Sequence, residues 1–206
     1  MQICHVNLSK DLRGGERQTI TLVRTLDGRV RQKVVVRRDA PLHDERTRLD
    51  LANGEIVPVA NSAVAAICAT RGADLVHVHE GRTVTVGAVR SLLGTPFVVT
   101  RRVLNSPKDN LVTKWCYRRA LRIATVSKAV ARTMRAYAVT TPVNTIYDCA
   151  DVQPSNPMSV REIKEDLEAT LVVGNVAELD DETKGQRTIL EVARRFQYTD
   201  PEIPPG

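Results

Sequence analysis

The sequence lacks the features of a membrane-spanning or exported protein. It contains no apolar run of about 18 residues, so we expect no transmembrane helix. The N-terminus has no charged region followed by an apolar one, so we expect no secretory signal either. These absences indicate a cytoplasmic protein, and they leave open a peripheral contact with the inner face of the membrane.

Cysteines and aromatic residues are also scarce. The four cysteines are far apart, and none forms a CxxC or a His/Cys pair at metal-binding spacing: Cys4, Cys68, Cys116 and Cys149. We therefore expect reduced thiols and no metal site. Only 3% of the residues are aromatic, which argues against the base stacking that binds single-stranded nucleic acid. No nucleic-acid partner is expected.

The glycine pattern of a dinucleotide-binding turn is missing as well. The first turn carries Gly14-Gly15 rather than Gly-x-Gly-x-x-Gly. The second predicted strand ends at Arg37 and Arg38, where dinucleotide-binding proteins have an acidic residue. A dinucleotide-dependent oxidoreductase is therefore disfavoured.

Positive charge is present in excess and is concentrated in one segment. The formal net charge is +6, and residues 101–135 hold ten Lys or Arg against a single acid, Asp109. Such a segment is either a surface that attracts phosphate, in a lipid, a substrate or a nucleic acid, or an ordinary solvated helix face.

Short apolar strands alternate with helices along most of the chain. The predicted strands cover 2–7, 34–36, 55–59, 73–79, 96–100, 122–126 and 143–147, and the predicted helices cover 16–26, 63–70, 82–93, 109–120 and 128–137. This order predicts an α/β fold with a Rossmann-like, doubly wound parallel sheet in residues 1–152. Pro58 places its strand at an edge or a strand end.

The remaining residues predict the start of a second, similar domain. Residues 153–169 contain Pro154 and Pro157 and are predicted to be a linker or crossing segment, with a short helix over 160–167. A buried strand over 170–176 and a helix over 186–196 follow. We expect residues 170–206 to be the truncated start of a second α/β domain, since one βα unit cannot close a core.

The first thirty residues form the first βα turn of this sheet. A strand over 2–7 is followed by a loop over 8–15 and a helix from Glu16 to Leu26. Gly14 and Gly15 allow a ligand to approach the backbone, and the helix start favours an anion. The alternative is a tight turn without a ligand.

Other candidate residues stand at the carboxyl ends of predicted strands, where open α/β sheets bind ligands. His79 and Glu80 end one strand, and we expect His77 to face the opposite side of that strand and, like His5, to pack between sheet and helix. Arg101 and Arg102 end the next strand. They either hold an anionic ligand by bidentate contacts or are solvated charges. Ser127 is the expected N-cap of the following helix.

Five segments in the same order resemble the family 4 glycosyltransferases, which have the GT-B architecture of two facing Rossmann-like domains. They are His5-Val6-Asn7 with Gly14-Gly15-Glu16-Arg17-Gln18; residues 73–79; Pro96-Phe97-Val98-Val99-Thr100-Arg101-Arg102; Thr125-Val126-Ser127-Lys128; and Val173-Gly174-Asn175-Val176 with Lys184-Gly185-Gln186. Together they span residues 1 to about 195.

The resemblance implies retaining, metal-independent transfer of a sugar from a nucleotide-diphosphate donor to a lipid- or saccharide-linked acceptor in envelope glycan synthesis, with no other cofactor. It implies catalytic roles for His79, Glu80 and Lys184, and contacts with the donor phosphates for Gly14, Gly15, Asn175 and Lys184. It implies that residues 1–152 form the acceptor-binding domain and that residues 170–206 are the truncated start of the donor-binding domain. It also implies acceptor contacts for Glu16, Arg17, Arg101, Arg102, Ser127 and Lys128. Asn175 replaces an Arg found in many relatives.

The resemblance also implies a missing donor-sugar motif, so we expect little transfer by this chain alone. The competing hypothesis is a non-catalytic module that binds an anionic glycolipid or a membrane surface through residues 101–135.

Overall fold

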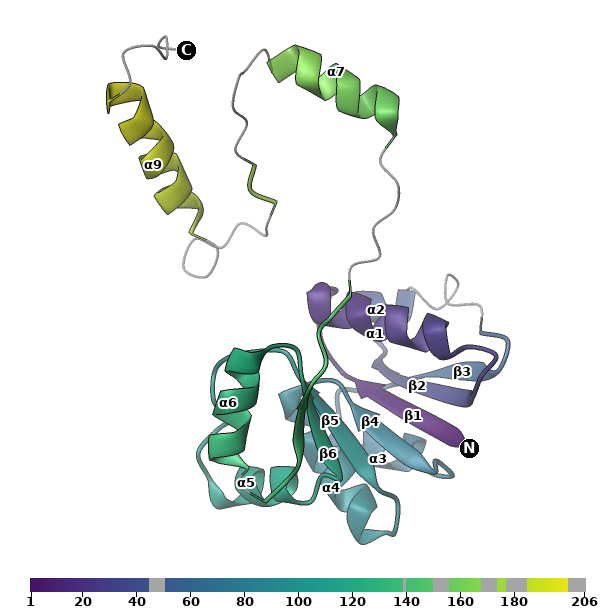
Figure 1. The fold of residues 1–206 in the computed structure, drawn as a ribbon. Coiled ribbons are helices and arrows are strands. Elements are labelled where there is room, and N and C mark those ends of the chain that lie inside the picture. Colours follow the sequence, from purple (N-terminus) through teal and green to yellow (C-terminus); the bar gives the residue numbers. More distant parts are fainter. Residues whose placement is uncertain (45–50, 139, 150–155, 168–173, 177–184, 200–206) are drawn as a thin grey trace. The chain divides into compact units, whose positions relative to one another are not determined.

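The computed structural model describes residues 1–44, 51–138, 140–149, 156–167, 174–176 and 185–199. The chain divides into two compact units, Met1–Asp151 and Val152–Gly206. The first unit contains the whole sheet, and the second contains two helices among its described residues (Figure 1).

The first unit is built on a seven-stranded parallel sheet in the order β3-β2-β1-β4-β5-β6-β7. Its strands are β1 (Gln2–Asn7), β2 (Arg31–Arg37), β3 (Gly54–Val59), β4 (Leu75–Val78), β5 (Phe97–Arg101), β6 (Arg122–Thr125) and β7 (Val143–Thr145). The strand order reverses between β1 and β4, which is the switch point where open α/β sheets bind ligands. The predicted Rossmann-like parallel sheet is confirmed, and β3, which contains Pro58, lies at its edge.

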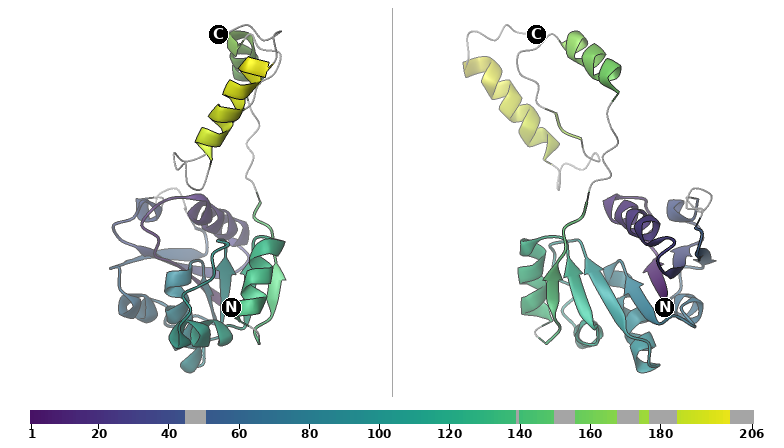
Figure 2. Two further views of the ribbon diagram at one scale, coloured as in Figure 1. Left: turned by 90° about the vertical axis from the view of Figure 1, so that its left-hand side faces the viewer. Right: turned by 45° about the vertical axis from the view of Figure 1, so that its right-hand side comes forward.

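Helices cover both faces of this sheet (Figures 1 and 2). On one face α1 (Gly14–Leu26) and α2 (Pro41–Asp44) enclose a small core with β2, which includes Ile20, Val23, Val34 and Val36. On the other face the larger core joins the strands to α3 (Ala63–Ala69), α4 (Val84–Leu92), α5 (Leu111–Arg118) and α6 (Lys128–Tyr137). Alternate residues of β2 enter different cores, because successive strand side chains point to opposite faces.

Several helix starts differ from the sequence predictions, and α4, for example, begins at Val84 rather than at 82. Gly14 and Gly15 form the first turn of α1 and are not part of the preceding loop. The main-chain N–H of Arg13 donates to Oε2 of Glu16 at 2.9 Å, and this bond fixes the earlier start. α5 begins at Leu111 rather than at 109, because the side chain of Asn110 accepts a hydrogen bond from the N–H of Thr113 at 2.7 Å and acts as the N-cap.

The second unit contains α7 (Pro157–Leu167) and α9 (Gln186–Thr199). Both helices were predicted, but α7 begins at Pro157, which the sequence analysis placed in the linker. Proline suits the first turn of a helix, where its missing N–H leaves no bond unmade. Of the strand predicted over 170–176, residues 174–176 have no regular structure, and 170–173 lie outside the described residues.

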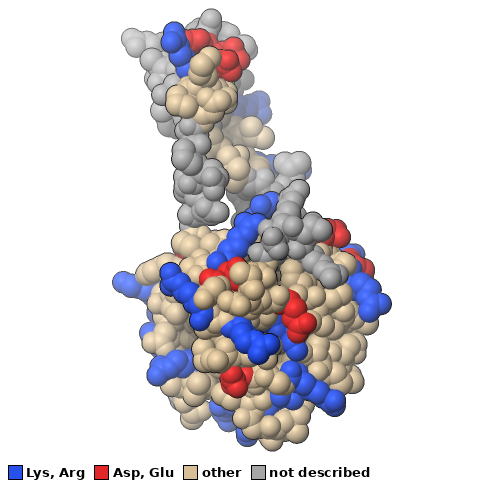
Figure 3. All heavy atoms as spheres, turned by 90° about the vertical axis from the view of Figure 1, so that its right-hand side faces the viewer, with Lys and Arg blue, Asp and Glu red and all other residues tan. Residues whose placement is uncertain are grey.

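None of the helices described in either unit has both the length and the apolar character that crossing a bilayer requires. The side of the first unit that carries α2 and β3 has Lys and Arg interspersed with Asp and Glu (Figure 3). That side therefore differs from residues 101–135, where the sequence is almost purely basic.

Candidate functional site

The carboxyl ends of β1 and β4 are joined by the side chain of Glu80. Its Oε1 accepts a hydrogen bond from the main-chain N–H of Leu8 at 2.7 Å, and its Oε2 accepts one from Nε of Arg82 at 3.3 Å. Burial raises the pKa of Glu80 above its ordinary value, and the charge of Arg82 opposes that shift. Glu80 is thus a partly exposed carboxyl at the switch point, where a ligand can contact it.

The N-terminus of α1 lies at the same edge of the sheet. The first bond of the helix runs from the N–H of Arg17 to the carbonyl of Arg13 at 3.0 Å, so the N–H groups of Gly14 and Gly15 precede the intrahelical ladder. A Cβ at Gly14 would meet nothing within 4 Å, whereas one at Gly15 would lie 3.5 Å from Cδ of Arg102. The backbone at Gly14 therefore faces open space, and the aliphatic part of the Arg102 side chain lies next to Gly15.

Glu16 and Arg17 have different surroundings. Glu16 is buried, and its carboxylate holds the N–H of Arg13 at the helix start. Arg17 is exposed on the same turn. Both had been predicted to contact an acceptor. Glu16 has a structural role that the sequence analysis did not foresee, and an acceptor contact by Arg17 stays a prediction.

Arg102 lies on the α1 face of the sheet. Its Nη1 donates to the carbonyl of His79 at 3.4 Å, and its Nε is 3.5 Å from Oδ2 of Asp148. Its side chain is only 15% exposed. Burial lowers the pKa of Arg102, and Asp148 opposes that shift. Sequence reasoning missed Asp148, although its place just beyond the last strand was the same signal that pointed to Arg102.

A cavity of about 290 Å³ lies beside Arg102. It is lined by α1, by the strand residues His77 and Thr100, and by the segment from Ile146 to Cys149. It combines apolar walls with one ion pair, between the largely buried Arg102 and the exposed Asp148. Such a cavity suits a ligand with an apolar part and a polar or anionic group.

Arg101 lies on the opposite face, because neighbouring strand residues alternate sides. Its Nη2 donates to the carbonyl of Asn105, and its Nη1 is the atom that a Cβ at Gly81 would meet at 2.7 Å. Burial raises the pKa of Tyr117, and adjacent Arg101 opposes that shift. The expected pair of arginines is therefore divided between two environments, each with its own cavity.

The second cavity, of about 490 Å³, lies on the Arg101 side of the edge. Its lining includes Glu80, Arg82, Arg101, Lys108 and Tyr117. The hydroxyl of Tyr117 and Nε of Arg101 are buried, and neither has a hydrogen-bond partner among the described residues. Arg82 is paired with Glu80, so Arg101 and Lys108 supply the excess positive charge, and with two unpaired donors they suit this cavity to an anion.

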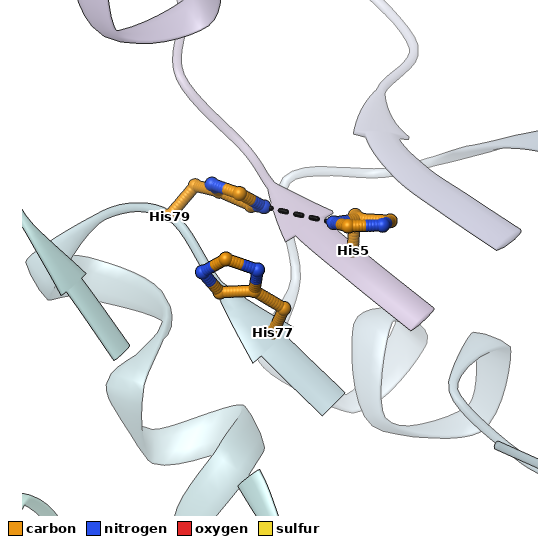
Figure 4. A group of neighbouring side chains, drawn as sticks. All are labelled: His5, His77 and His79. Atoms are coloured by element: carbon orange, nitrogen blue, oxygen red, sulfur yellow. Dashed lines mark hydrogen bonds between the residues drawn. The ribbon is translucent and has the colours of Figure 1, made fainter. Parts of the chain in front are cut away.

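The three histidines of β1 and β4 meet on the α1 face of the sheet (Figure 4). The ring centroids of His77 and His79 are 4.0 Å apart, and Nδ1 of His5 is 3.0 Å from Nε2 of His79. The expectation that His77 and His79 face opposite sides was wrong, because strand residues two positions apart share a face. The ring of His79 is buried in this cluster, while its carbonyl accepts from Arg102.

Ser127 and Lys128 begin α6 at the end of β6. Oγ of Ser127 accepts a hydrogen bond from the N–H of Val130 at 3.2 Å, which confirms the predicted N-cap. Lys128 is exposed at the first position of the helix. Their acceptor contacts remain predictions.

The predicted donor-side residues belong to the second unit. Asn175 is exposed, and Lys184 lies outside the described residues. The structure therefore brings together Gly14, Gly15, Glu80, Arg101 and Arg102 at one edge, and the donor contacts predicted for Asn175 and Lys184 stay predictions.

Comparison with known proteins gives one matching family and several similar structures. The family model for Glycosyltransferase Family 4 matches residues 12–153. HepE from Anabaena, solved in complex with UDP, has a TM-score of 0.77 and 18% identity, and the match covers 95% of this chain and 58% of that one. The complex of the same protein with UDP-glucose gives a TM-score of 0.77, 17% identity, and coverage of 95% and 57%.

A more distant match is the apo form of the lipopolysaccharide outer core galactosyltransferase WaaB. Its TM-score is 0.54 with 10% identity, and the match covers 74% of this chain and 47% of that one. At these identities the likeness establishes the fold. The chain spans less than two thirds of the length of each of these proteins. A search of curated proteins gave no match.

Proposed function

We propose, because the chain belongs to glycosyltransferase family 4, that its sheet domain binds the acceptor for transfer of a sugar from a nucleotide-diphosphate sugar. The observation that carries this proposal is a pair of cavities near the switch point, each with an arginine that follows β5 or ends it. One cavity holds Arg101 with Glu80, Arg82 and Lys108, and the other lies beside α1 and holds Arg102 paired with Asp148. The acceptor would be a lipid- or saccharide-linked glycan of the cell envelope. HepE, which shares the fold, has been solved with UDP and with UDP-glucose.

The donor diphosphate would bind the N–H groups of Gly14 and Gly15, and we propose further contacts from Asn175 and Lys184. Negative charge grows on the leaving diphosphate during transfer, so a lysine and oriented N–H donors stabilise the transition state more than the ground state. We propose on this basis a retaining transfer in which cationic groups, rather than a metal ion, stabilise the leaving group.

Glu80 is the better placed of the two candidate catalytic residues in the first unit. Its carboxyl is partly exposed at the edge, and burial favours its protonated form. The ring of His79 is buried. We therefore propose that His79 contributes through its main-chain carbonyl, which accepts a hydrogen bond from Arg102 and positions that guanidinium.

The acceptor proposal can be tested by saturation-transfer NMR on the 206-residue chain. The probe is a monosaccharide linked to farnesyl diphosphate, and the same monosaccharide without the diphosphate is the ligand control. We expect binding of the charged probe to weaken at least 10-fold in Arg102→Ala or Arg101→Ala. The matched control Arg118→Ala removes an exposed arginine of α5 and should bind like the wild type. Equal binding by all variants would contradict the acceptor site.

The expected lack of transfer is tested separately. The purified chain is incubated with UDP-glucose and the same acceptor, and radiolabelled product is counted. We expect no turnover above background. Sustained turnover would overturn the idea that this chain lacks a working donor site, while leaving the acceptor site intact.

A membrane-binding function is the second candidate, and the surface of α5 favours it. Leu111 is 86% exposed, Val112 64% and Trp115 41%. Exposed Lys108 and Arg118 lie near this apolar surface in the sequence. Apolar side chains beside cations are typical of helices that lie in an anionic interface.

Flotation with vesicles separates the two functions. If the membrane-binding function is correct, the chain floats with phosphatidylglycerol vesicles and not with phosphatidylcholine vesicles. The double variant Leu111→Ser with Trp115→Ser then no longer floats. Val64→Ser, which removes an exposed apolar side chain from α3, is the control. A chain that stays in solution with both vesicle types would contradict membrane binding.

A further inference from the structure

His5, His77 and His79 bring three imidazoles to one point from two adjacent strands. β1 and β4 are parallel neighbours, with His5 directly opposite His77, and His79 follows two residues later on the same face. One ring nitrogen from each residue lies within 4.8 Å of the other two (Figure 4). Nitrogens around a tetrahedral ion with bonds of about 2.0–2.1 Å would be about 3.3 Å apart, close to the 3.0 Å between His5 Nδ1 and His79 Nε2.

We propose that these three histidines form a binding site for one divalent transition-metal ion of the Zn²⁺ and Co²⁺ type. A bound ion would link β1 to β4, in addition to the hydrogen bond from the N–H of Leu8 to Glu80. The ion has no part in the transfer chemistry proposed above, and the inference does not depend on that chemistry. The sequence predicted no metal site, because no ligands stand close together along the chain and these three come from segments 72 residues apart (His5 to His77).

A bound ion would take the place of a hydrogen bond inside the cluster. Imidazole coordinates through a lone pair, so each ring nitrogen that faces the ion must carry no proton. Nδ1 of His5 and Nε2 of His79 are hydrogen-bonded to each other at 3.0 Å, so one of these two nitrogens carries a proton. An ion binds when that proton moves to the other nitrogen of the same ring or is released.

Neighbouring side chains are placed to orient the ligands. Nε2 of His77 bonds to Oγ1 of Thr100 at 2.7 Å, which leaves Nδ1 of the same ring for the cluster. Nε2 of His5 and Oε1 of Gln32 are both buried and lack a hydrogen-bond partner among the described residues. Metal-bound histidines almost always direct their second nitrogen at such an oxygen.

Access and charge narrow the class of ion. His77 is partly exposed and lines the 290 Å³ cavity, so an ion can reach the cluster from there. The positive charge of Arg102 lies beside the cluster and repels a cation, but Asp148 is paired with Arg102 and offsets part of that repulsion. Mg²⁺ and Ca²⁺ bind through charged oxygen ligands, whereas Zn²⁺ and Co²⁺ form bonds with neutral imidazole. The cluster therefore selects the latter.

The test is titration of the EDTA-treated chain with CoCl₂, followed by visible absorption of tetrahedral Co²⁺ and by metal content after gel filtration. We expect one Co²⁺ per chain, displaced by ZnCl₂ and not by MgCl₂, with a rise in melting temperature. His77→Gln should abolish the absorption. His43→Gln, which removes a histidine outside the cluster, should leave it unchanged.

A further variant keeps all three ligands. Thr100→Val removes only the hydroxyl that bonds His77, and we expect Co²⁺ affinity to fall about 10-fold or more. Circular dichroism establishes that each variant is folded. Failure of the folded wild type to bind stoichiometric Co²⁺ or Zn²⁺ would overturn the proposal, as would undiminished binding by His77→Gln. Neither result bears on the acceptor site.

Discussion

Replacing Gly87 by alanine tests how closely α4 packs on the sheet. A Cβ at this position would lie 2.2 Å from Cδ2 and 2.6 Å from Cγ of Phe97. Carbon atoms in contact are usually about 3.5–4.0 Å apart, so the overlap exceeds about 1 Å. Phe97 is fully buried in β5, so its ring has no open space to move into.

The expected loss of stability follows from two opposing effects. Alanine gains about 1 kcal/mol over glycine in a helix interior. Over-packing a tight core costs about 3 kcal/mol at the upper end of its usual range. We expect Gly87→Ala to lose about 2 kcal/mol, which lowers the urea midpoint by about 1 M for a slope of about 2 kcal/mol per M. Circular dichroism during urea unfolding measures this shift.

Two further variants show whether the contact with Phe97 is the cause. Phe97→Leu in the Gly87→Ala background should recover part of the loss, with a coupling of about 0.5–3 kcal/mol in the double-mutant cycle. Gly14→Ala is the control, since its Cβ would meet nothing within 4 Å, and we expect it to be as stable as the wild type. A Gly87→Ala protein that unfolds at the wild-type urea concentration or higher would refute the reasoning.

Three other predictions concern titration, reactivity and capping. A hydrogen bond from Arg37 lowers the pKa of Asp39 to about 2. The stability from this pair should therefore be fully present above the unfolded-state pKa of Asp39 and be lost as the pH falls through about 2. NMR titration of Arg37→Gln should show the pKa of Asp39 returning toward 3.8. Burial raises the pKa of Cys4 to about 12, so iodoacetamide should label exposed Cys68 and spare Cys4 in the native protein, and equal labelling in peptide mapping would contradict this. Ser127→Ala should cost about 1 kcal/mol in urea unfolding and Ser127→Asp should recover it, because either oxygen can cap α6; a loss that Asp does not recover would contradict a capping role.

The secondary structure was largely readable from local patterns. Val34-Val35-Val36 predicted a buried strand, Pro58 an edge strand, and Ser127 the start of a helix, and all three are confirmed. These features depend on residues within one or two turns of each other. Family membership was also readable, because the matching segments are short and lie in a fixed order.

The candidate site was only partly readable. Sequence reasoning located Glu80, Arg101 and Arg102 because each follows a strand of a parallel sheet. It did not place Arg101 and Arg102 in separate cavities, although the alternation of side chains along a strand was enough to do so. It also missed Asp148, whose importance comes from a contact with Arg102 across 46 residues of chain (102 to 148).

The sequence by itself determined the alternation of strands and helices, the parallel sheet and the basic character of residues 101–135. Hydrophobic periodicity and local charge are properties of neighbouring residues, so they survive without knowledge of the fold. Only the tertiary structure decided that β1 lies against β4, and this pairing brings His5 to His77 and Leu8 to Glu80. Strand order depends on which buried faces pack together across the whole domain, and no short stretch of sequence contains that information.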